Sequence, residues 1–337
     1  MNTVDKKPVL VTGASGFVGS HITRQLVSQG RNVRVLLRRS SNQEALRDLP
    51  VEIFYGDVLD RGSLATAMAE CGTVFHSVVD ARFWLTDTTP LYRHNVEGLE
   101  NAMEAALAAK VERFIFTSTM GTLGQNPNGA VTETIPFNWR DRAPPYILAR
   151  LEAENRFLDY CKNRGLKGVA LCIANTYGPE DYQPTPHGGA LWQAAQGKLP
   201  AITDSSAPTV DIRDAAAAAL LAEQFGGSGE RYIIANEFIS NKEFYGIVAE
   251  VLGNKAPKLI SRKFAYGIAT LAESLCKLAR RKDYLLSRDA VYLSYAFKQL
   301  DNTKAREQLH WQPRPIRQTI YDAVRWYNEH DMQKKGG

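Results

Sequence analysis

Three glycines near the start of the chain have the spacing of a phosphate-binding turn. Gly13, Gly16 and Gly19 follow the apolar run Val9–Val11 and lead into a stretch of helical periodicity that continues to Gly30. A short apolar run of this kind is typical of a buried parallel strand. Glycine permits a tight turn and close approach of the backbone to a pyrophosphate, and the N–H groups at the start of the next helix attract negative charge. The strand-turn-helix context therefore favours a dinucleotide site over a purely structural turn.

The same segment resembles the extended type of the short-chain dehydrogenase/reductase superfamily. Its sequence is Thr12-Gly-Ala-Ser-Gly-Phe-Val-Gly19, with G-x-x-G-x-x-G spacing. The segments Asn95–Gly98 and Asn175–Pro179 also match extended-type motifs, and the resemblance extends to about residue 330. Phe116–Thr122 is most similar to the branch of dihydroflavonol reductases and 3β-hydroxysteroid dehydrogenases. The resemblance implies a Rossmann domain and a smaller C-terminal substrate domain.

The resemblance also implies a catalytic tyrosine with a basic partner one helical turn later. Tyr146 and Arg150 match this pattern, and their i, i+4 spacing places both side chains on one helix face. In the superfamily the tyrosine is the general acid that protonates a carbonyl oxygen, and the basic residue lowers its pKa. A hydroxyl residue at the end of the fifth expected strand holds the substrate oxygen. Thr119 is the matching position, with Ser118 as the alternative.

Arg150 departs from the superfamily, in which this residue is usually lysine. Its guanidinium can favour the tyrosinate form of Tyr146 and bind a ribose hydroxyl, but it does not lose a proton at accessible pH. Three interpretations follow. The chain is an enzyme with Arg150 as an electrostatic partner, or a nucleotide-binding sensor or scaffold, or the alignment is different. The chain contains no Tyr-x-x-x-Lys segment, which argues against a different alignment.

Basic and hydroxyl side chains follow the second expected strand. Arg38, Arg39, Ser40 and Ser41 lie where an acidic residue would bind the ribose 2′-hydroxyl of NAD, and they suit the 2′-phosphate of NADP instead. We therefore expect NADP(H), with NAD(H) and a solvated basic turn as alternatives. Together with the three glycines, Tyr146 and Arg150, the expected cofactor contacts include Ser15, Phe17, Val18, Asp57, Val58, Ser77, Val78, Thr117, Ile173 and Asn175.

Aromatic and apolar residues after the fourth expected strand predict the substrate cleft. The expected pocket comprises Asp80, Phe83, Trp84, Met120, Asn175, Thr176, Tyr182 and Trp192. These side chains favour a small hydrophobic or aromatic carbonyl substrate, although each aromatic residue could instead belong to the core. The alternative is a nucleotide-sugar epimerase or dehydratase. A nucleotide-sugar site would need several cationic side chains near the diphosphate of the substrate. The candidates are Arg142, His187 and Arg213.

Alternating strand-like and helix-like segments would bring these residues together. Strands are expected to begin near residues 9, 32, 51, 73, 113 and 168, with helices that include 42–49, 91–109 and 146–164. This alternation predicts an α/β fold, a Rossmann-type doubly wound parallel sheet with a smaller, mostly helical C-terminal domain. The pattern breaks at 180–208, expected to be loop-rich around one helix at 189–196, and returns at 209–235. We therefore expect interleaved domains, with 1–179 plus 209–236 binding NADP(H) and 180–208 plus 237–330 binding substrate.

The composition is typical of a globular protein. The 337 residues are 44% hydrophobic and 23% charged, with a net charge of +5 that does not suggest nucleic-acid binding. The first residues lack the apolar core of a signal peptide, and no window has ~18 uncharged apolar residues, so we expect a cytoplasmic protein without a transmembrane segment. Cys71, Cys161, Cys172 and Cys276 form no C-x-x-C pair, so we expect reduced thiols and no metal site.

Two segments could contact partners. The basic run Lys277–Lys282 follows the apolar helical stretch Phe264–Leu275 and is either a solvated helix end or a contact with an anionic membrane surface. The helices at 95–109 and 146–163 form a dimer interface in many extended-type relatives, so a homodimer is expected. Small residues suit close packing there, or they face the chain's own core; they are Ala102, Ala105, Ala106 and Ala109.

Overall fold

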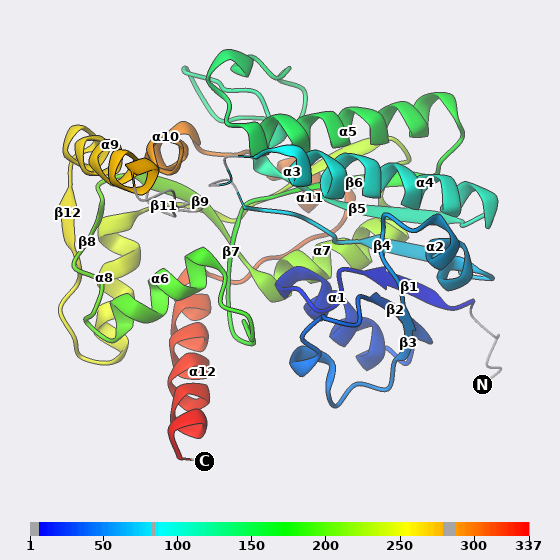
Figure 1. Ribbon diagram of the computed structural model, residues 1–337, viewed down its shortest axis with the longest axis horizontal. Helices are drawn as coiled ribbons and strands as arrows, with labels where there is room; N and C mark the ends of the chain where they lie inside the picture. Colours follow the sequence, from blue (N-terminus) through cyan, green and yellow to red (C-terminus); the bar gives the residue numbers. More distant parts are fainter. Residues whose placement is uncertain (1–6, 83–84, 86, 279–286, 337) are drawn as a thin grey trace.

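A seven-stranded parallel sheet forms the centre of the molecule in the computed structural model, which describes residues 7–82, 85, 87–278 and 287–336 (Figure 1). The strand order is β10-β6-β5-β4-β1-β2-β3, and every neighbouring pair is parallel. The strands are β1 (Val9–Thr12), β2 (Val33–Leu37), β3 (Glu52–Tyr55), β4 (Thr73–His76), β5 (Arg113–Thr119), β6 (Gly168–Ile173) and β10 (Glu230–Ile234). The doubly wound fold predicted from the sequence is confirmed.

Different helices cover the two faces of this sheet, because successive residues of a strand point to opposite faces. The helices on one face are α1 (Phe17–Ser28) and α7 (Ile212–Phe225); those on the other are α2 (Arg61–Met68), α4 (Gly98–Ala108) and α5 (Pro145–Asn163). Ile115 of β5 belongs to the core beneath α1 and α7. Its neighbours Phe114 and Phe116 belong to the core beneath α2, α4 and α5. Both faces of such a strand are covered by helices, so consecutive apolar residues are buried on alternate faces.

The order of the strands reverses between β1 and β4. In the sheet, β2 lies on one side of β1 and β4 lies on the other. The connections that leave the carboxyl ends of β1 and β4 therefore run in opposite directions and leave a crevice between them. In open α/β sheets this is where ligands bind. The glycine turn leaves β1 at Thr12, and the segment that begins with Ser77 leaves β4 at this same edge.

A second layer of structure lies at one end of the large sheet (Figure 1). It contains a sheet of order β11-β9-β7 and the pair β12-β8. These strands are β7 (Asn175–Tyr177), β8 (Ala201–Thr203), β9 (Ser206–Asp211), β11 (Glu237–Ser240) and β12 (Lys258–Ile260). The helices α6 (Pro186–Ala195), α8 (Asn241–Val251) and α12 (Ile316–Gly336) enclose a core of their own. The remaining helices here are α9 (Arg262–Leu278), α10 (Arg288–Ala296) and α11 (Thr303–Gln308).

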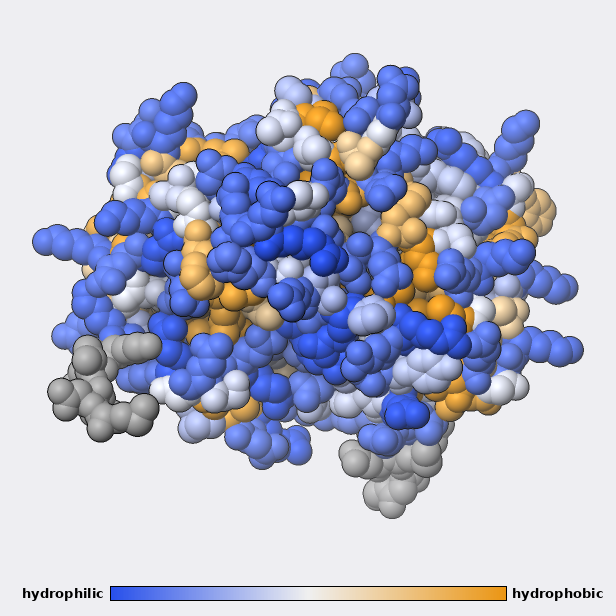
Figure 2. All heavy atoms as spheres, turned by 180° about the vertical axis from the view of Figure 1, so that it is seen from behind, coloured by the Kyte–Doolittle hydropathy of each residue, from blue (hydrophilic) through white to orange (hydrophobic). Residues whose placement is uncertain are grey.

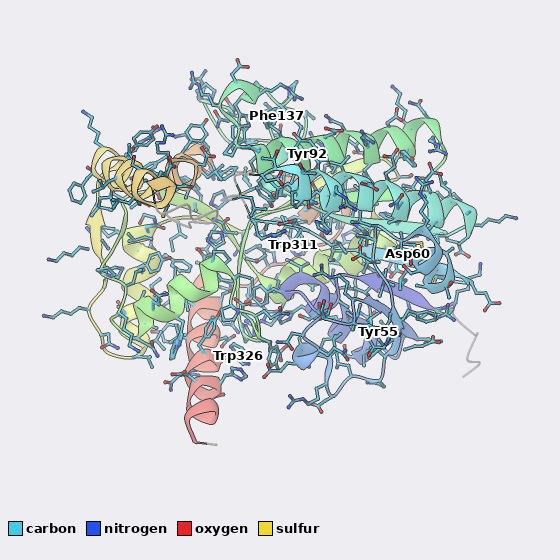
Figure 3. All side chains as sticks on the ribbon, viewed as in Figure 1. Tyr55, Asp60, Tyr92, Phe137, Trp311 and Trp326 are labelled. Atoms are coloured by element: carbon cyan, nitrogen blue, oxygen red, sulfur yellow. The ribbon has the colours of Figure 1, made fainter. Side chains whose placement is uncertain are left out.

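The chain returns from this layer to the large sheet through Trp311. Its ring is buried in the core beneath α7, and its indole nitrogen donates a 2.9 Å hydrogen bond to the carbonyl of Asp214 (Figure 3). The Arg314 side chain pairs with the Asp214 carboxylate at 2.8 Å. α12, which carries Trp326, then follows, so the two layers are joined by side chains as well as by the chain (Figure 3). The interleaved domain boundaries remain a prediction.

Three local expectations were wrong or incomplete. The helix expected at 42–49 is only the 3₁₀ turn Glu44–Leu46, because the Asn42 side chain accepts the Glu44 N–H and competes with helix formation. The helix expected at 91–109 is divided into α3 (Thr89–Tyr92), a π-helical turn (Arg93–Glu97) and α4. The region 180–208 contains β8 and part of β9 besides α6, which begins at Pro186, earlier than expected.

The surface seen from behind is mostly hydrophilic, with hydrophobic residues in separate areas (Figure 2). Within the described part of the chain, no helix is both long enough and apolar enough to cross a lipid bilayer. Most of the basic run Lys277–Lys282 lies outside the described residues. The alanines that could have served a dimer, Ala102, Ala105 and Ala106, are buried in the chain's own core. They therefore give no support to a dimer, which stays a prediction.

Candidate active site

The glycine turn packs so closely against the loop after β4 that larger residues would collide. Gly13 has a φ of +74°, and a Cβ atom on it would lie 2.7 Å from the carbonyl carbon of Ser77. A Cβ on Gly19 would lie 2.2 Å from the Gly13 oxygen, because the first turn of α1 crosses directly over the loop. Both positions therefore require glycine for steric reasons.

The start of α1 is open to an anion. Gly16 is the N-cap residue, no side chain caps the helix, and its first turn contains no acidic residue. The N–H groups and the positive end of the helix dipole are thus left for a ligand. A cavity of about 540 Å³ lies in front of this end. It is lined by Gly13, Ser15, Gly16, Phe17, Leu36, Arg38, Ser41, Gly56, Asp57, Val58, Ser77, Val78, Val79, Asp80, Ala81, Arg82, His94, Gln183 and Thr185.

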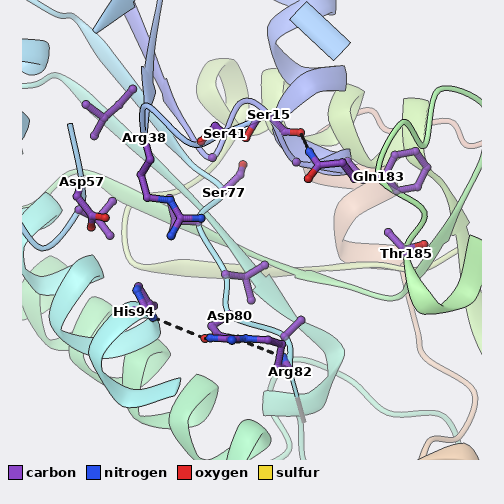
Figure 4. Close-up of a pocket in the computed structure, with 18 of the residues that line it drawn as sticks. Ser15, Arg38, Ser41, Asp57, Ser77, Asp80, Arg82, His94, Gln183 and Thr185 are labelled. Carbon is purple, nitrogen blue, oxygen red and sulfur yellow. Dashed lines mark hydrogen bonds and ion pairs between the residues drawn. The ribbon is translucent and has the colours of Figure 1, made fainter. Parts of the chain in front are cut away.

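One end of the cavity has the side chains expected to select the cofactor. Arg38 reaches from the end of β2 into the cavity, and Asp57 lies on the neighbouring wall (Figure 4). Arg39 does not line the cavity; its guanidinium carbon lies 5.0 Å from the centre of the Tyr55 ring. Ser41 lines the cavity in place of Ser40, because the chain turns after Arg38.

The other end is held by the π-helical turn. The Asn95 amide exchanges two 3.0 Å hydrogen bonds with the backbone of Asp80, one with the N–H and one with the carbonyl. The Asp80 carboxylate pairs with Arg82 at 2.5 Å and lies 3.6 Å from His94 (Figure 4). Burial alone would raise the pKa of Asp80, but its hydrogen bonds from Arg82 and the nearby cations bring it below the usual value. This loop is therefore fixed and carries an ionised carboxylate.

Tyr146 and Arg150 lie in the first part of α5, which begins at Pro145. Burial raises the pKa of Tyr146, the Arg150 cation lowers it, and Asp80 raises it, with a net increase. Arg150 is 1% exposed and its guanidinium carbon lies 5.0 Å from the centre of the Phe116 ring. Its Nη2 donates a 2.6 Å bond to the Thr117 carbonyl, whereas Nε and Nη1 have no partner in the protein. The protonated phenol of Tyr146 is therefore affected by the buried cation of Arg150, as the sequence pattern predicts.

The two candidate hydroxyls at the end of β5 have different environments. The Ser118 hydroxyl donates to the Glu154 carboxylate, which also accepts a 2.8 Å bond from Thr122 and pairs with Arg231 at 2.8 Å. Ser118 is thus engaged beneath α5. Thr119 Oγ1 accepts the Gly121 N–H at 3.2 Å and keeps its own hydrogen available. The geometry favours Thr119 as the residue that holds a substrate oxygen.

Gln183 and Thr185 form a wall of the cavity that the sequence did not predict as cofactor-binding. Gln183 donates a 3.0 Å bond to the Ser15 carbonyl in the glycine turn (Figure 4). Arg24 of α1 pairs with Glu180 at 2.8 Å, and His21 donates to the Pro179 carbonyl at 3.2 Å. A polar residue in a proline-rich loop carries no distinctive signal, so only the tertiary structure places Gln183 here.

Several predicted residues do not line the cavity. Tyr182 packs edge-on against Trp326, and Trp192 stacks on Tyr327, so both belong to the contacts of α12. His76 is buried against Phe114, with its pKa lowered to about 3 by burial and by Arg150. Those that are described but not among the lining residues are Val18, Gly19, Arg39, Ser40, Thr117, Ser118, Thr119, Met120, Tyr146, Arg150, Ile173, Asn175, Thr176, Tyr182 and Trp192. Phe83 and Trp84 lie outside the described residues.

Comparison with known proteins agrees with this geometry. Residues 9–235 match the model of the NAD dependent epimerase/dehydratase family. The chain belongs to this family. Its matched region begins at β1 and ends after β10, so it includes the glycine turn, Thr119, Tyr146 and the whole seven-stranded sheet. The family is part of the extended short-chain dehydrogenase/reductase superfamily, as the motifs indicated.

Relatives of this epimerase/dehydratase family member span almost its whole length. It is 31% identical over 331 residues to a putative dihydroflavonol 4-reductase of Synechocystis, covering 96% of this chain and 95% of the relative. It is 30% identical over 325 residues to sterol demethylase protein B of Methylococcus capsulatus, covering 96% and 99%. The crystal structure of gox2253 superposes with a TM-score of 0.85 at 30% identity, covering 96% and 99%.

The site of this family member fits the nicotinamide dinucleotide that the family implies. Gly13 and Gly16 line the cavity, and the uncapped N-terminus of α1 faces it. The buried Ser77 Oγ and two nitrogens of Arg150 lack partners in the protein, and buried polar groups of this kind are normally satisfied. Among the residues that the structure describes, no group of three or more His, Cys, Asp or Glu side chains could hold a metal ion. The four cysteines are free thiols.

Proposed function

We propose that this chain is an NADP(H)-dependent oxidoreductase that reduces a hydrophobic ketone or aldehyde to an alcohol, or catalyses the reverse reaction. The observation that carries the proposal is the Tyr146–Arg150 pair. Tyr146 has a raised pKa, and it lies beside a buried cation that keeps two donor nitrogens without a protein partner. Tyr146 does not line the cavity, but the charge of Asp80, which does, raises its pKa. A protonated phenol at this distance from the cavity is the kind of proton donor that carbonyl reduction needs.

The residues have distinct roles in this mechanism. The nicotinamide group, when bound, supplies the hydride that the carbonyl carbon receives. The Tyr146 hydroxyl donates its proton to the carbonyl oxygen, so that hydride and proton together convert the carbonyl to an alcohol. The Thr119 hydroxyl donates a hydrogen bond that orients the same oxygen. The unpartnered nitrogens of Arg150 hold ribose hydroxyls, and its charge stabilises the phenolate that forms.

Two features support NADP(H) as the cofactor. Arg38 and Ser41 both line the cavity, and a guanidinium with a nearby hydroxyl suits a 2′-phosphate. Arg39 contributes less directly than expected, because it stacks on Tyr55. Since Asp57 also lines this end, NADH should be compared with NADPH in every assay.

The proposal of a hydrophobic substrate rests on the lining of the cavity and on the relatives. Val78 and Val79 follow β4 and line the end near Asp80. The names of two relatives refer to a dihydroflavonol and to a sterol. A nucleotide-sugar substrate has less support, because the Arg213 guanidinium already bonds Asp211 and Asp322 at 2.7 Å each.

The test is an NADPH-oxidation screen with steroids, flavonoids, aromatic aldehydes and β-keto lipids. We expect one of these classes to be reduced, and Tyr146→Phe to lower kcat by about 10²–10⁴-fold because the proton donor is lost. NADPH binding, followed by fluorescence, should change little. The control is Tyr321→Phe, which removes a hydroxyl on α12.

Two outcomes would count against the proposal. If Tyr146→Phe reduces the substrate as fast as the unmodified chain, the mechanism is wrong. If UDP- or GDP-sugars raise the unfolding temperature and no carbonyl compound is reduced, the epimerase/dehydratase alternative is favoured. NADPH binding without turnover of any substrate would favour a sensor.

A further inference from the structure

Helix α9 buries its small residues and exposes its large apolar ones. Phe264, Ile268, Leu271 and Leu275 are 60%, 37%, 62% and 57% exposed. At ~100° per residue these four side chains lie within about 60° of one another, so they form one stripe. The inner face of α9 instead presents small side chains, Ala265 and Ala269. This arrangement is the reverse of an ordinary surface helix, whose large apolar residues face the core.

The surroundings of this stripe are basic. Lys258, Arg262 and Lys263 are exposed at the end where α9 begins, and Leu259 of β12 extends the apolar surface with 41% exposure. Cations at a helix N-terminus oppose the helix dipole, so they are not placed there for the stability of α9. The apolar stripe with its basic end, residues 258–275, is called the α9 surface below.

Among the residues that the structure describes, the carboxylates of α9, of its neighbour α10 and of Asp204 are mostly hydrogen-bonded or ion-paired. Glu273, the acidic residue of α9, is buried and bonds Arg288 at 2.8 Å. Asp204 accepts a hydrogen bond from Tyr295 of α10. Asp204 and, on α10, Asp289 are both exposed. An apolar stripe bordered by lysine and arginine is complementary to a bilayer that contains anionic lipids, rather than to an acidic or neutral protein surface alone.

The α9 surface is linked to the segment that precedes the catalytic tyrosine. Ala265 and Ala269 form a small cluster with Val291 of α10. On the same helix, the ring of Tyr292 lies 6.3 Å from that of Trp139, which is buried six residues before Pro145. A molecule docked through α9 would thus present the substrate-binding layer toward the lipid.

We propose that the α9 surface docks this protein on an anionic membrane surface without crossing it. The apolar stripe enters the boundary between headgroups and acyl chains, and Lys258, Arg262 and Lys263 contact lipid phosphates. This inference stands on exposure and charge and does not require the proposed reductase activity.

The experiment measures binding of the full chain to sedimenting vesicles. One vesicle is phosphatidylcholine alone, and the other contains about one-quarter phosphatidylglycerol. We expect binding to the anionic vesicles and much weaker binding to the neutral ones. Leu271→Glu with Leu275→Glu should lower the partition coefficient by at least about tenfold, because two apolar side chains no longer enter the lipid. Lys258→Gln with Lys263→Gln should lower binding to anionic vesicles by about tenfold and leave neutral binding unchanged.

Ile53→Glu is the matched control, since Ile53 is 38% exposed on β3 at the far edge of the sheet. Circular dichroism checks that each variant is folded. The proposal is overturned if the unmodified chain binds neither vesicle, or if the double leucine variant binds as well as the control. A dimer that the leucine substitutions dissociate, with no vesicle binding, would assign the α9 surface to a second copy of the chain instead.

Discussion

Arg150 is the residue at which this site differs most from its superfamily. A lysine usually occupies the position, and the structure shows what the larger side chain does there. The guanidinium carbon lies 5.0 Å from the centre of the Phe116 ring, Nη2 bonds the Thr117 carbonyl, and two nitrogens have no partner in the protein. A delocalised cation on an aromatic ring retains its charge when buried more readily than an ammonium group does. We infer that Arg150 replaces the electrostatic role of lysine, but not a role that needs proton loss.

We expect Arg150→Met to raise the pKa of Tyr146 further, because burial and Asp80 would act without the opposing cation. Alcohol oxidation needs the phenolate, so the rising limb of its pH profile should move to higher pH. Arg150→Lys should keep the limb near its original position. The measurement is kcat for oxidation against pH, together with the Kd of the cofactor. An unshifted limb in Arg150→Met would show that the cation does not act on Tyr146.

At the scale of elements, the π-helical turn before α4 (Arg93–Glu97) positions the loop that follows β4. The wider turn brings Asn95 to the loop after β4, where its amide bonds both the N–H and the carbonyl of Asp80. Turns of this kind occur mostly as single interruptions of α-helices and frequently at functional sites. The loop that it holds lines the cavity from Ser77 to Arg82.

Asn95→Ala should loosen this loop and raise the KM for NADPH about tenfold. Two buried backbone groups would lose their partners, so the free energy of unfolding should fall by about 1–3 kcal/mol. Asn302→Ala is the control, because Asn302 donates a 2.6 Å bond to the Ala235 carbonyl and does not line the cavity. It should cost stability without changing KM. Steady-state kinetics and urea unfolding measure both effects. Equal effects on KM would contradict the positioning role.

The whole molecule contains two buried histidines that are neutral in the folded state. Burial lowers the pKa of His21 to about 4 and that of His76 to about 3. Their ordinary value is 6.5, so the unfolded chain takes up protons first as the pH falls. Their contribution is fully present above about pH 6.5 and is lost as the pH falls toward 4 for His21 and 3 for His76. Acidification should therefore destabilise the fold.

Between pH 7 and pH 5, each histidine should lower the free energy of unfolding by about 2 kcal/mol. His21→Gln removes one of these groups and should reduce the loss on acidification by that amount. Urea unfolding at both pH values measures the difference. The control is His310→Asn, at an exposed position. If His21→Gln loses as much stability as the unmodified chain, His21 does not control the acid limb.

The parts of the fold and site that follow local patterns were predictable. The glycine turn, the apolar runs that form strands and the Tyr146–Arg150 spacing each depend on residues close together in the chain, so a short window contains the signal. Contacts between distant segments were not. Gln183 bonds Ser15 across the cavity, and Glu154 engages Ser118 beneath α5, yet neither contact leaves a pattern in the sequence. Likewise, the aromatic residues Tyr182 and Trp192 could belong to a pocket or a core, and packing against α12 decided it.

The sequence by itself determined the fold class, the family and the positions of Gly13, Tyr146 and Arg150, because strand, turn and helix propensities and i, i+4 spacing are local properties. Only the tertiary structure bonded the Ser118 hydroxyl to Glu154, placed Ser41 and not Ser40 at the cavity, and turned the apolar stripe of α9 outward. These outcomes depend on which distant side chains come within hydrogen-bonding or packing distance. The burial of a residue is a property of the assembled layers and not of the residue alone.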